Sequence, residues 1–93
     1  MLDLFVSGFI SRRTKLCSDK NNKPFALAKI RVLQQDKSLI INLITFRNSV
    51  IEKIIDLKEG DPISVSGPAN VYIAKNAHKE NFIRIDITAS KVY

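Results

Sequence analysis

With 93 residues the chain is long enough for one small domain, and we expect a single domain over residues 1–93. Its 45% apolar and 26% charged residues exclude intrinsic disorder, and its single cysteine and single histidine exclude an internal disulfide framework and a cysteine/histidine zinc site. Fifteen Lys and Arg against nine Asp and Glu give a net charge of +6, which favours a polyanionic partner because neutralised phosphates release counterions.

The sequence also bears on where the protein works. Its apolar runs are far shorter than the ~20 residues that a membrane-spanning helix needs. The chain does not open with a basic segment followed by an apolar one, as a secretory signal does. We therefore expect a cytoplasmic protein that is held together by apolar burial, alone or combined with self-association.

The first predicted strand covers residues 2–10 and is apolar on both faces. Its even-numbered residues form one face, and Phe5 and Phe9 lie on the other. A strand of this kind is usually covered on both sides, and in so short a chain we expect the second cover to come from another subunit. Residues 11–23 are predicted to form a polar loop, in which Asn21-Asn22 marks a turn.

Two further strands are predicted in the first half of the chain. The second covers residues 24–33 and places small or branched residues on one face, while Leu27, Lys29 and Arg31 lie on the other. A turn is predicted at residues 34–38. The third strand covers residues 39–46 and is largely apolar on both faces.

A helix is predicted from residue 48 to about residue 57. Asn48 or Ser49 can cap its first turn, and its apolar residues form one broad stripe. Gly60 lies where the end of a helix favours a residue that tolerates positive φ, and Pro62 prevents continuation.

Two strands complete the chain, at residues 63–74 and 82–92, and the polar segment 75–81 joins them. The last strand alternates isoleucine with polar residues, which is typical of a half-buried strand. The order of elements is strand, strand, strand, helix, strand, strand. It predicts an all-β fold, a five-stranded β-barrel with one α-helix between strands three and four, which is the order of the OB-fold.

Several segments follow one another in an order that is also found in a known family. They are Leu4–Ile10, Pro24–Val32, Asn42–Phe46 with the helix that ends at Leu57–Asp61, Ile63–Gly67 and Ile87–Val92. The ordered set spans nearly the whole chain and resembles the bacterial single-stranded DNA-binding proteins. The resemblance implies an OB-fold that binds single-stranded DNA without sequence preference, in DNA replication, repair or recombination. It also implies no cofactor, and a homodimer or homotetramer formed through the first strand.

Two features depart from that family's pattern. The printed sequence ends at Tyr93 without the Gly/Pro/Gln-rich tail and acidic tip that recruit replication and repair proteins, and it contains no tryptophan. Short, tailless relatives similar to primosomal replication protein B are therefore an equally natural comparison, with replication or primosome proteins as partners. A plasmid-, phage- or mobile-element-encoded variant also fits.

The predicted nucleic-acid interface is the outer face of strands two and three with the loops that follow strands one and four. Cations there hold phosphates, and aromatic rings stack on bases. The candidate cations are Lys29 and Arg31 in strand two, Arg47 after strand three, Arg12, Arg13, Lys15, Lys20 and Lys23 in the first loop, and Lys75 and Lys79, with His78 as a polar neighbour, in the other loop.

The candidate stacking residues are Phe46 and Tyr72. Phe46 shares a face of the third strand with Ile40, Asn42 and Ile44, which in the family faces DNA. Tyr72 can stack while its hydroxyl stays in water. Phe9 is predicted either to stack or to lie in a subunit interface, and Phe5, Phe25 and Phe82 are assigned to the core or an interface.

The sequence weighs against an enzyme, because it contains no metal-ligand cluster, no glycine-rich phosphate loop and no recognisable nucleophile–base pair. The alternative is an OB-fold adaptor, in replication restart or on a mobile element, that acts mainly through protein–protein contacts. RNA binding also remains open. The basic residues around strands two and three favour nucleic acid over the adaptor.

Overall fold

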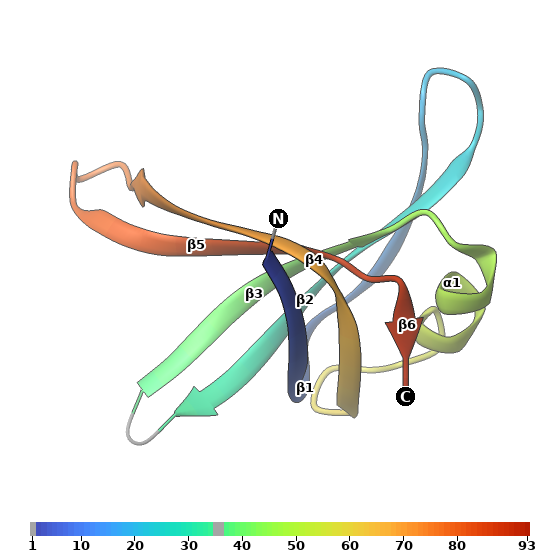
Figure 1. Cartoon of the computed structure of the whole chain (residues 1–93), viewed down its shortest axis with the longest axis horizontal. Coiled ribbons are helices and arrows are strands. Elements are labelled where there is room, and N and C mark those ends of the chain that lie inside the picture. The colour runs from blue at the N-terminus through green and yellow to red at the C-terminus, as the bar shows by residue number, and fades with distance from the viewer. Residues whose placement is uncertain (1, 35–36) are drawn as a thin grey trace.

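The chain folds into a closed ring of strands with one short helix (Figure 1). A computed structural model describes residues 2–34 and 37–93. The elements in chain order are β1 (Leu2–Ser18), β2 (Pro24–Gln34), β3 (Lys37–Thr45), α1 (Asn48–Ile54), β4 (Pro62–Lys75), β5 (Asn81–Thr88) and β6 (Lys91–Val92). The sheet order is β1-β2-β3-β5-β4-β6, and β1 also pairs with β4, which closes the barrel. The predicted OB-fold, with its helix between strands three and four, is confirmed.

Closure depends on β1, which pairs with two different strands. Residues 2–9 pair with β4, and the register then passes to β2 from Phe9 onward. Gly8 lies at this change of partner, where a Cβ atom would collide with the backbone carbonyl oxygen of Arg31. Glycine is therefore required for β2 to approach β1 at the point where the barrel closes.

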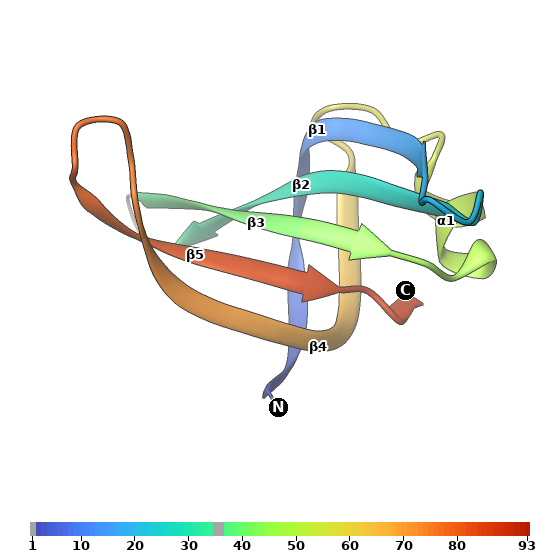
Figure 2. The same cartoon turned by 90° about the horizontal axis from the view of Figure 1, so that it is seen from above.

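The core fills the inside of the barrel and is capped by the helix. The inner faces of β2 and β3 are buried at Ala26, Ile30 and Leu43, and Val50 and Ile54 of α1 are also buried in the core. The helix lies beside one end of the sheet, near the β1–β2 hairpin, and the β4–β5 hairpin extends from the other end (Figure 2). One outer face of the sheet is therefore left uncovered by the helix.

The prediction of a loop over residues 11–23 is wrong, because β1 continues to Ser18 and its last residues pair with β2. The register shifts between Ile10 and Arg12 and again between Arg12 and Lys15. Such bulges interrupt the alternation by which a strand is recognised. The hairpin turn itself is confirmed. Asn22 has a φ of 61°, and the Asp19 carboxylate accepts hydrogen bonds from two backbone N–H groups of the turn, those of residues 21 and 23.

The helix is shorter than predicted and is capped differently. It ends at Ile54, and Leu57 packs against the core although it lies beyond the end of the helix. Neither Asn48 nor Ser49 caps it, since the N-cap residue is Arg47 and no side chain completes the cap. The buried Thr45 hydroxyl instead donates to the carbonyl oxygen of residue 89 at 2.9 Å and accepts from the backbone N–H of Arg47 at 3.3 Å.

The end of the helix region and the last strand also differ from the prediction. Gly60 does have positive φ, 89°, but in the turn before β4 rather than at the helix end. The strand predicted over residues 82–92 divides into β5 and β6, because the N–H of Ala89 bonds to Ile44 of β3 and that of Ser90 bonds to Ser66 of β4. The chain thus changes partner between the two strands.

The remaining boundaries agree more closely with the predictions. Part of the turn predicted at residues 34–38 falls on residues 35–36, which lie outside the described residues, and the residues on either side belong to β2 and β3.

Two phenylalanines assigned to the core or an interface are not in the core, since Phe5 is 62% exposed and Phe82 is 43% exposed. In the part of the chain that the structure describes, no helix is long and apolar enough to span a membrane.

The close approach at Gly8 predicts a specific loss of stability. Replacing Gly8 with alanine forces the new methyl group against the Arg31 backbone, which has no flexible end that can move aside. We expect the free energy of unfolding to fall by about 1–3 kcal/mol, measured by urea denaturation. The Asp3→Ala variant, which adds no bulk at an exposed site of the same strand, serves as the control. Equal stability of Gly8→Ala and the wild type would contradict this account of closure.

Candidate nucleic-acid interface

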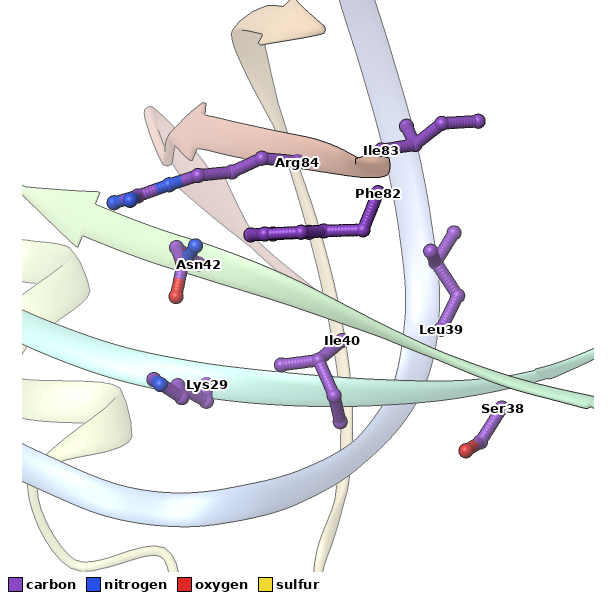
Figure 3. Close-up of a pocket in the computed structure, with 8 residues that line it drawn as sticks. All are labelled: Lys29, Ser38, Leu39, Ile40, Asn42, Phe82, Ile83 and Arg84. Atoms are coloured by element: carbon purple, nitrogen blue, oxygen red, sulfur yellow. The ribbon is translucent and has the colours of Figure 1, made fainter. Parts of the chain in front are cut away.

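The uncovered outer face carries a groove formed by two adjoining hollows. The first, of about 860 Å³, is lined by residues of β2, β3 and β5, namely Lys29, Ser38, Leu39, Ile40, Asn42, Phe82, Ile83 and Arg84 (Figure 3). The second, of about 340 Å³, is lined by Arg12, Arg13, Lys15, Leu27, Ala28, Lys29, Asn42, Leu43 and Arg84. Lys29, Asn42 and Arg84 line both. We call these two hollows together the outer groove.

The strand register explains why these residues meet. Arg12 of β1 lies opposite Lys29 of β2, and Lys29 lies opposite Asn42 of β3. The parallel pairing of β3 with β5 then places Asn42 opposite Asp86. One row of polar side chains thus crosses the outer face at right angles to the strands.

Asp86 is the centre of a hydrogen-bonded cluster on this row. Its carboxylate accepts hydrogen bonds from the Tyr72 hydroxyl at 2.7 Å, the Asn42 amide nitrogen at 3.1 Å and Arg84 Nε at 3.2 Å. The Arg84 guanidinium also lies over the Tyr72 ring, 5.7 Å from its centroid. Arg84 is therefore held by a carboxylate and an aromatic ring while it lines the groove.

These contacts shift the acid–base behaviour of the cluster. Partial burial alone would raise the pKa of Asp86, but hydrogen bonds from Tyr72, Asn42 and Arg84 and the guanidinium charge lower that pKa below its usual range. The pKa of Tyr72 is raised, first because Asp86 accepts its proton in a hydrogen bond and then by desolvation and the carboxylate charge. Asp86 is therefore ionised at neutral pH.

An aromatic ring lies within the groove, but it is not the one predicted. Phe82 lies in the groove between Arg84 and Ile40 (Figure 3), with 43% of its surface exposed. Phe46 lies one residue beyond the end of β3 and packs its ring 5.7 Å from that of Phe25, so it does not line the outer groove. The prediction that it continues the face of the third strand is wrong, because β3 ends at Thr45.

The structure separates the predicted basic residues into two groups. Arg12, Arg13, Lys15 and Lys29 line the outer groove. The others lie around it: Arg31 faces Ile40 across β2 and β3, Lys20 and Lys23 lie in or beside the β1–β2 turn, Arg47 is the helix N-cap, and Lys75 and Lys79 lie in the β4–β5 hairpin. Tyr72 lies on β4, beside the groove, under Arg84.

The sequence alone did not identify Arg84, Asn42 and Phe82 as members of one site. The alternation of isoleucine with polar residues in the last strand already placed Arg84 and Asp86 together on an outer face. The missing information was the pairing of β5 with β3, because residues more than forty positions apart in the chain carry no local signal of their contact. Phe82 was missed for the same reason. It lies on the same face of β5 as Arg84 and Asp86, and only the pairing of β5 with β3 brings that face to the groove.

Several solved structures that are similar over the full chain are single-stranded DNA-binding proteins. The mitochondrial protein from S. cerevisiae has a TM-score of 0.77 at 11% identity, covering 99% of this chain and 92% of that one. The small protein from Streptomyces coelicolor has 0.71 at 15%, with coverage of 99% and 92%. The SSB of Plasmodium falciparum, in complex with single-stranded DNA, has 0.69 at 12%, with 100% and 91%. No protein-family profile matches the sequence, and no sequence relative is found among curated proteins. The similarity therefore establishes a shared fold.

The Asp86 cluster predicts a titration change that can be measured directly. In the Asp86→Asn variant the phenol loses its anionic acceptor, so we expect the pKa of Tyr72 to fall toward the ordinary value for tyrosine. The measurement is a pH titration of the Tyr72 ring carbon by NMR. The Lys53→Ala variant, on the helix, is the control and leaves the titration unchanged. An unaltered Tyr72 pKa in Asp86→Asn would contradict the cluster.

Proposed function

We propose that the chain binds single-stranded DNA without sequence specificity and holds one strand in the outer groove. The observation that supports this most strongly is the convergence of five basic side chains with one exposed aromatic ring in that groove, namely Arg12, Arg13, Lys15, Lys29, Arg84 and Phe82. Phosphate contacts with cations and stacking on aromatic rings are the two interactions that sequence-independent binding uses. The similar fold of single-stranded DNA-binding proteins supports the proposal.

The charge of the groove supplies the affinity for the phosphate backbone. Arg12 and Lys29 lie opposite each other on neighbouring strands, and Lys29 and Arg84 line the same two hollows. Further basic residues lie outside the groove on the elements around it and add to the positive charge that a strand meets there: Lys20, Lys23, Arg31, Arg47, Lys75 and Lys79. Because this attraction releases counterions, we expect binding to weaken steeply with salt.

The apolar part of the groove supplies the preference for a single strand. Phe82 is flanked by Ile40, which is 39% exposed, and Leu27 at the other end of the groove is 40% exposed. A nucleobase can stack here only if its face is free, and in a duplex both faces are already stacked. Outside the groove, Tyr72 under Arg84 and Phe46 beside Phe25 are further exposed rings.

We also propose that the protein acts in the cytoplasm, without a cofactor, in DNA replication, repair or recombination. We further propose that it forms a homodimer or homotetramer through β1. Phe5 is 62% exposed and Leu2 is 49% exposed on this strand. Residues 2–8 pair with β4 along one edge, and no described strand pairs with their other edge. An apolar strand with a free edge favours pairing with a second copy.

A second candidate function is an adaptor that acts mainly through protein contacts. The observation that favours it is a row of exposed aliphatic residues on the β4–β5 hairpin, where Val71 is 50%, Ile73 is 73% and Ile83 is 60% exposed. Exposed apolar patches of this kind often mark interaction sites. The two functions differ in their response to DNA, which the following experiments measure.

Arg12 and Lys29, which lie opposite each other on β1 and β2, are expected to contact phosphates of the bound strand. In the Arg12→Ala/Lys29→Ala variant we expect affinity for oligo-dT at 0.1 M salt to fall roughly 10- to 30-fold, and the slope of log K against log salt to decrease by roughly 0.7 for each lost phosphate contact. The measurement is fluorescence anisotropy at several salt concentrations, with duplex DNA and RNA as competitors. The Lys53→Ala/Lys58→Ala variant removes the same charge outside the groove and keeps nearly wild-type binding. Equal loss in both variants would show that the groove is not the site.

Phe82 is expected to stack on a base of the bound strand. In Phe82→Ala we expect roughly 5- to 150-fold weaker binding with an unchanged salt slope, because stacking is worth about 1–3 kcal/mol per base and involves no counterion. Phe82→Leu keeps apolar bulk without an aromatic face and controls for folding. Wild-type affinity in Phe82→Ala would remove this ring from the site.

A further inference from the structure

A hydrogen-bond acceptor with a fixed orientation lies in the outer groove. The Asn42 side chain is half-buried and lines both hollows. Its amide nitrogen donates to Asp86 Oδ1 at 3.1 Å. A side-chain amide has a donor end and an acceptor end, and a partner that can only accept determines which end faces it.

Asp86 is such a partner. Its two carboxylate oxygens accept hydrogen bonds from Tyr72, Arg84 and Asn42, and these donors together with the Arg84 charge lower the pKa of Asp86, so the carboxylate carries no proton to donate. The Asn42 amide nitrogen must therefore face Asp86. Its oxygen points the other way, toward the Lys29 side of the groove (Figure 3).

The surroundings of this oxygen are donors. Lys29 lies opposite Asn42 on the neighbouring strand, and Arg84 lines the same two hollows. Within the described residues, the Asn42 amide oxygen accepts no side-chain hydrogen bond. The groove thus presents one neutral acceptor between two cationic donors.

We propose that Asn42 selects among the bases of a bound strand and favours those whose Watson–Crick edge has an exocyclic amino group beside a ring acceptor, cytosine and adenine, over thymine and uracil. This inference rests on the proposed single-strand binding and adds to it a modest preference among bases at one position, which leaves binding to any sequence possible. The amino group of cytosine donates to the Asn42 oxygen, and its ring nitrogen and carbonyl accept from Lys29 or Arg84. Uracil and thymine place a carbonyl oxygen where the amino group would be, so two acceptors face each other without a proton between them.

The clearest comparison is between cytosine and uracil. The two bases lack the 5-methyl group and differ only in the group at C4 and the proton at N3. The probes are fluorescein-labelled dC and dU homopolymers of about 12 nucleotides, a length within the range that one OB-fold contacts. In a homopolymer every register places the same base at Asn42, so the change in the affinity ratio when Asn42 or Asp86 is substituted reports this position.

We expect the wild type to bind the dC probe roughly 2- to 10-fold more tightly than the dU probe, which is the effect of one net hydrogen bond. In Asn42→Leu the acceptor is lost, and the ratio falls to about 1. In Asp86→Asn the ratio also falls, because an amide at residue 86 can donate as well as accept and no longer fixes the orientation of Asn42. Asn70→Ala removes a neighbouring exposed amide on β4 and keeps the wild-type ratio.

The outcomes separate this inference from the proposed function. Tight binding of both probes with a ratio of 1 in the wild type would overturn the base preference and leave single-strand binding intact. A ratio that persists in both Asn42→Leu and Asp86→Asn would overturn the role of Asn42. Binding of neither probe by the wild type would overturn the proposed function itself. If Asn42→Leu fails a thermal unfolding check by circular dichroism, the ratio in Asp86→Asn alone decides.

Discussion

The parallel pairing of β3 with β5 is the contact on which the rest of the structure depends. On the inside of the barrel it joins Ile41 to Ile85 and Leu43 to Ile87, and these apolar pairs belong to the core or pack against it. On the outside it joins Asn42 to Asp86. Because side chains alternate between the two faces of a strand, one register sets both the core and the polar row of the groove.

This arrangement explains why an acidic residue lies within a basic groove. Asp86 reduces the local positive charge, yet it holds Arg84, Asn42 and Tyr72 in one orientation. The Arg84–Asp86 ion pair is 47% and 31% exposed at its two side chains, and exposed ion pairs contribute little to folding stability. Its effect is therefore better understood as positioning. A guanidinium and an amide that are already oriented lose less side-chain freedom when a ligand binds.

The sequence was sufficient for those features that local patterns determine. The buried face of β2, the turn at Asn22 and the order of elements follow from alternation and turn residues, and they identify the OB-fold. Residues 11–18 were misassigned because two bulges and an exposed, charged face remove the apolar alternation of a strand. The helix was predicted too long because Leu57 contributes to the core without being helical.

The candidate site could be predicted only in part, for a different reason. Lys29, Arg12, Arg13 and Lys15 lie on β1 and β2, which form a hairpin, so their proximity follows from the local sequence. Arg84 and Phe82 reach the groove through the pairing of β5 with β3, which joins residues far apart in the chain. Phe46 was chosen over Phe82 because alternation alone does not show where a strand ends.

The most direct test of the central claim is a map of the binding surface by NMR. Oligo-dT is added to the ¹⁵N-labelled chain, and the amide shifts are followed residue by residue. Shifts that concentrate on the outer groove, at Lys29, Asn42 and Arg84, are the predicted result. Shifts confined to residues 2–8 of β1 and to β6, with unchanged amides along β3 and β5, would contradict the account and place the nucleic acid on another face.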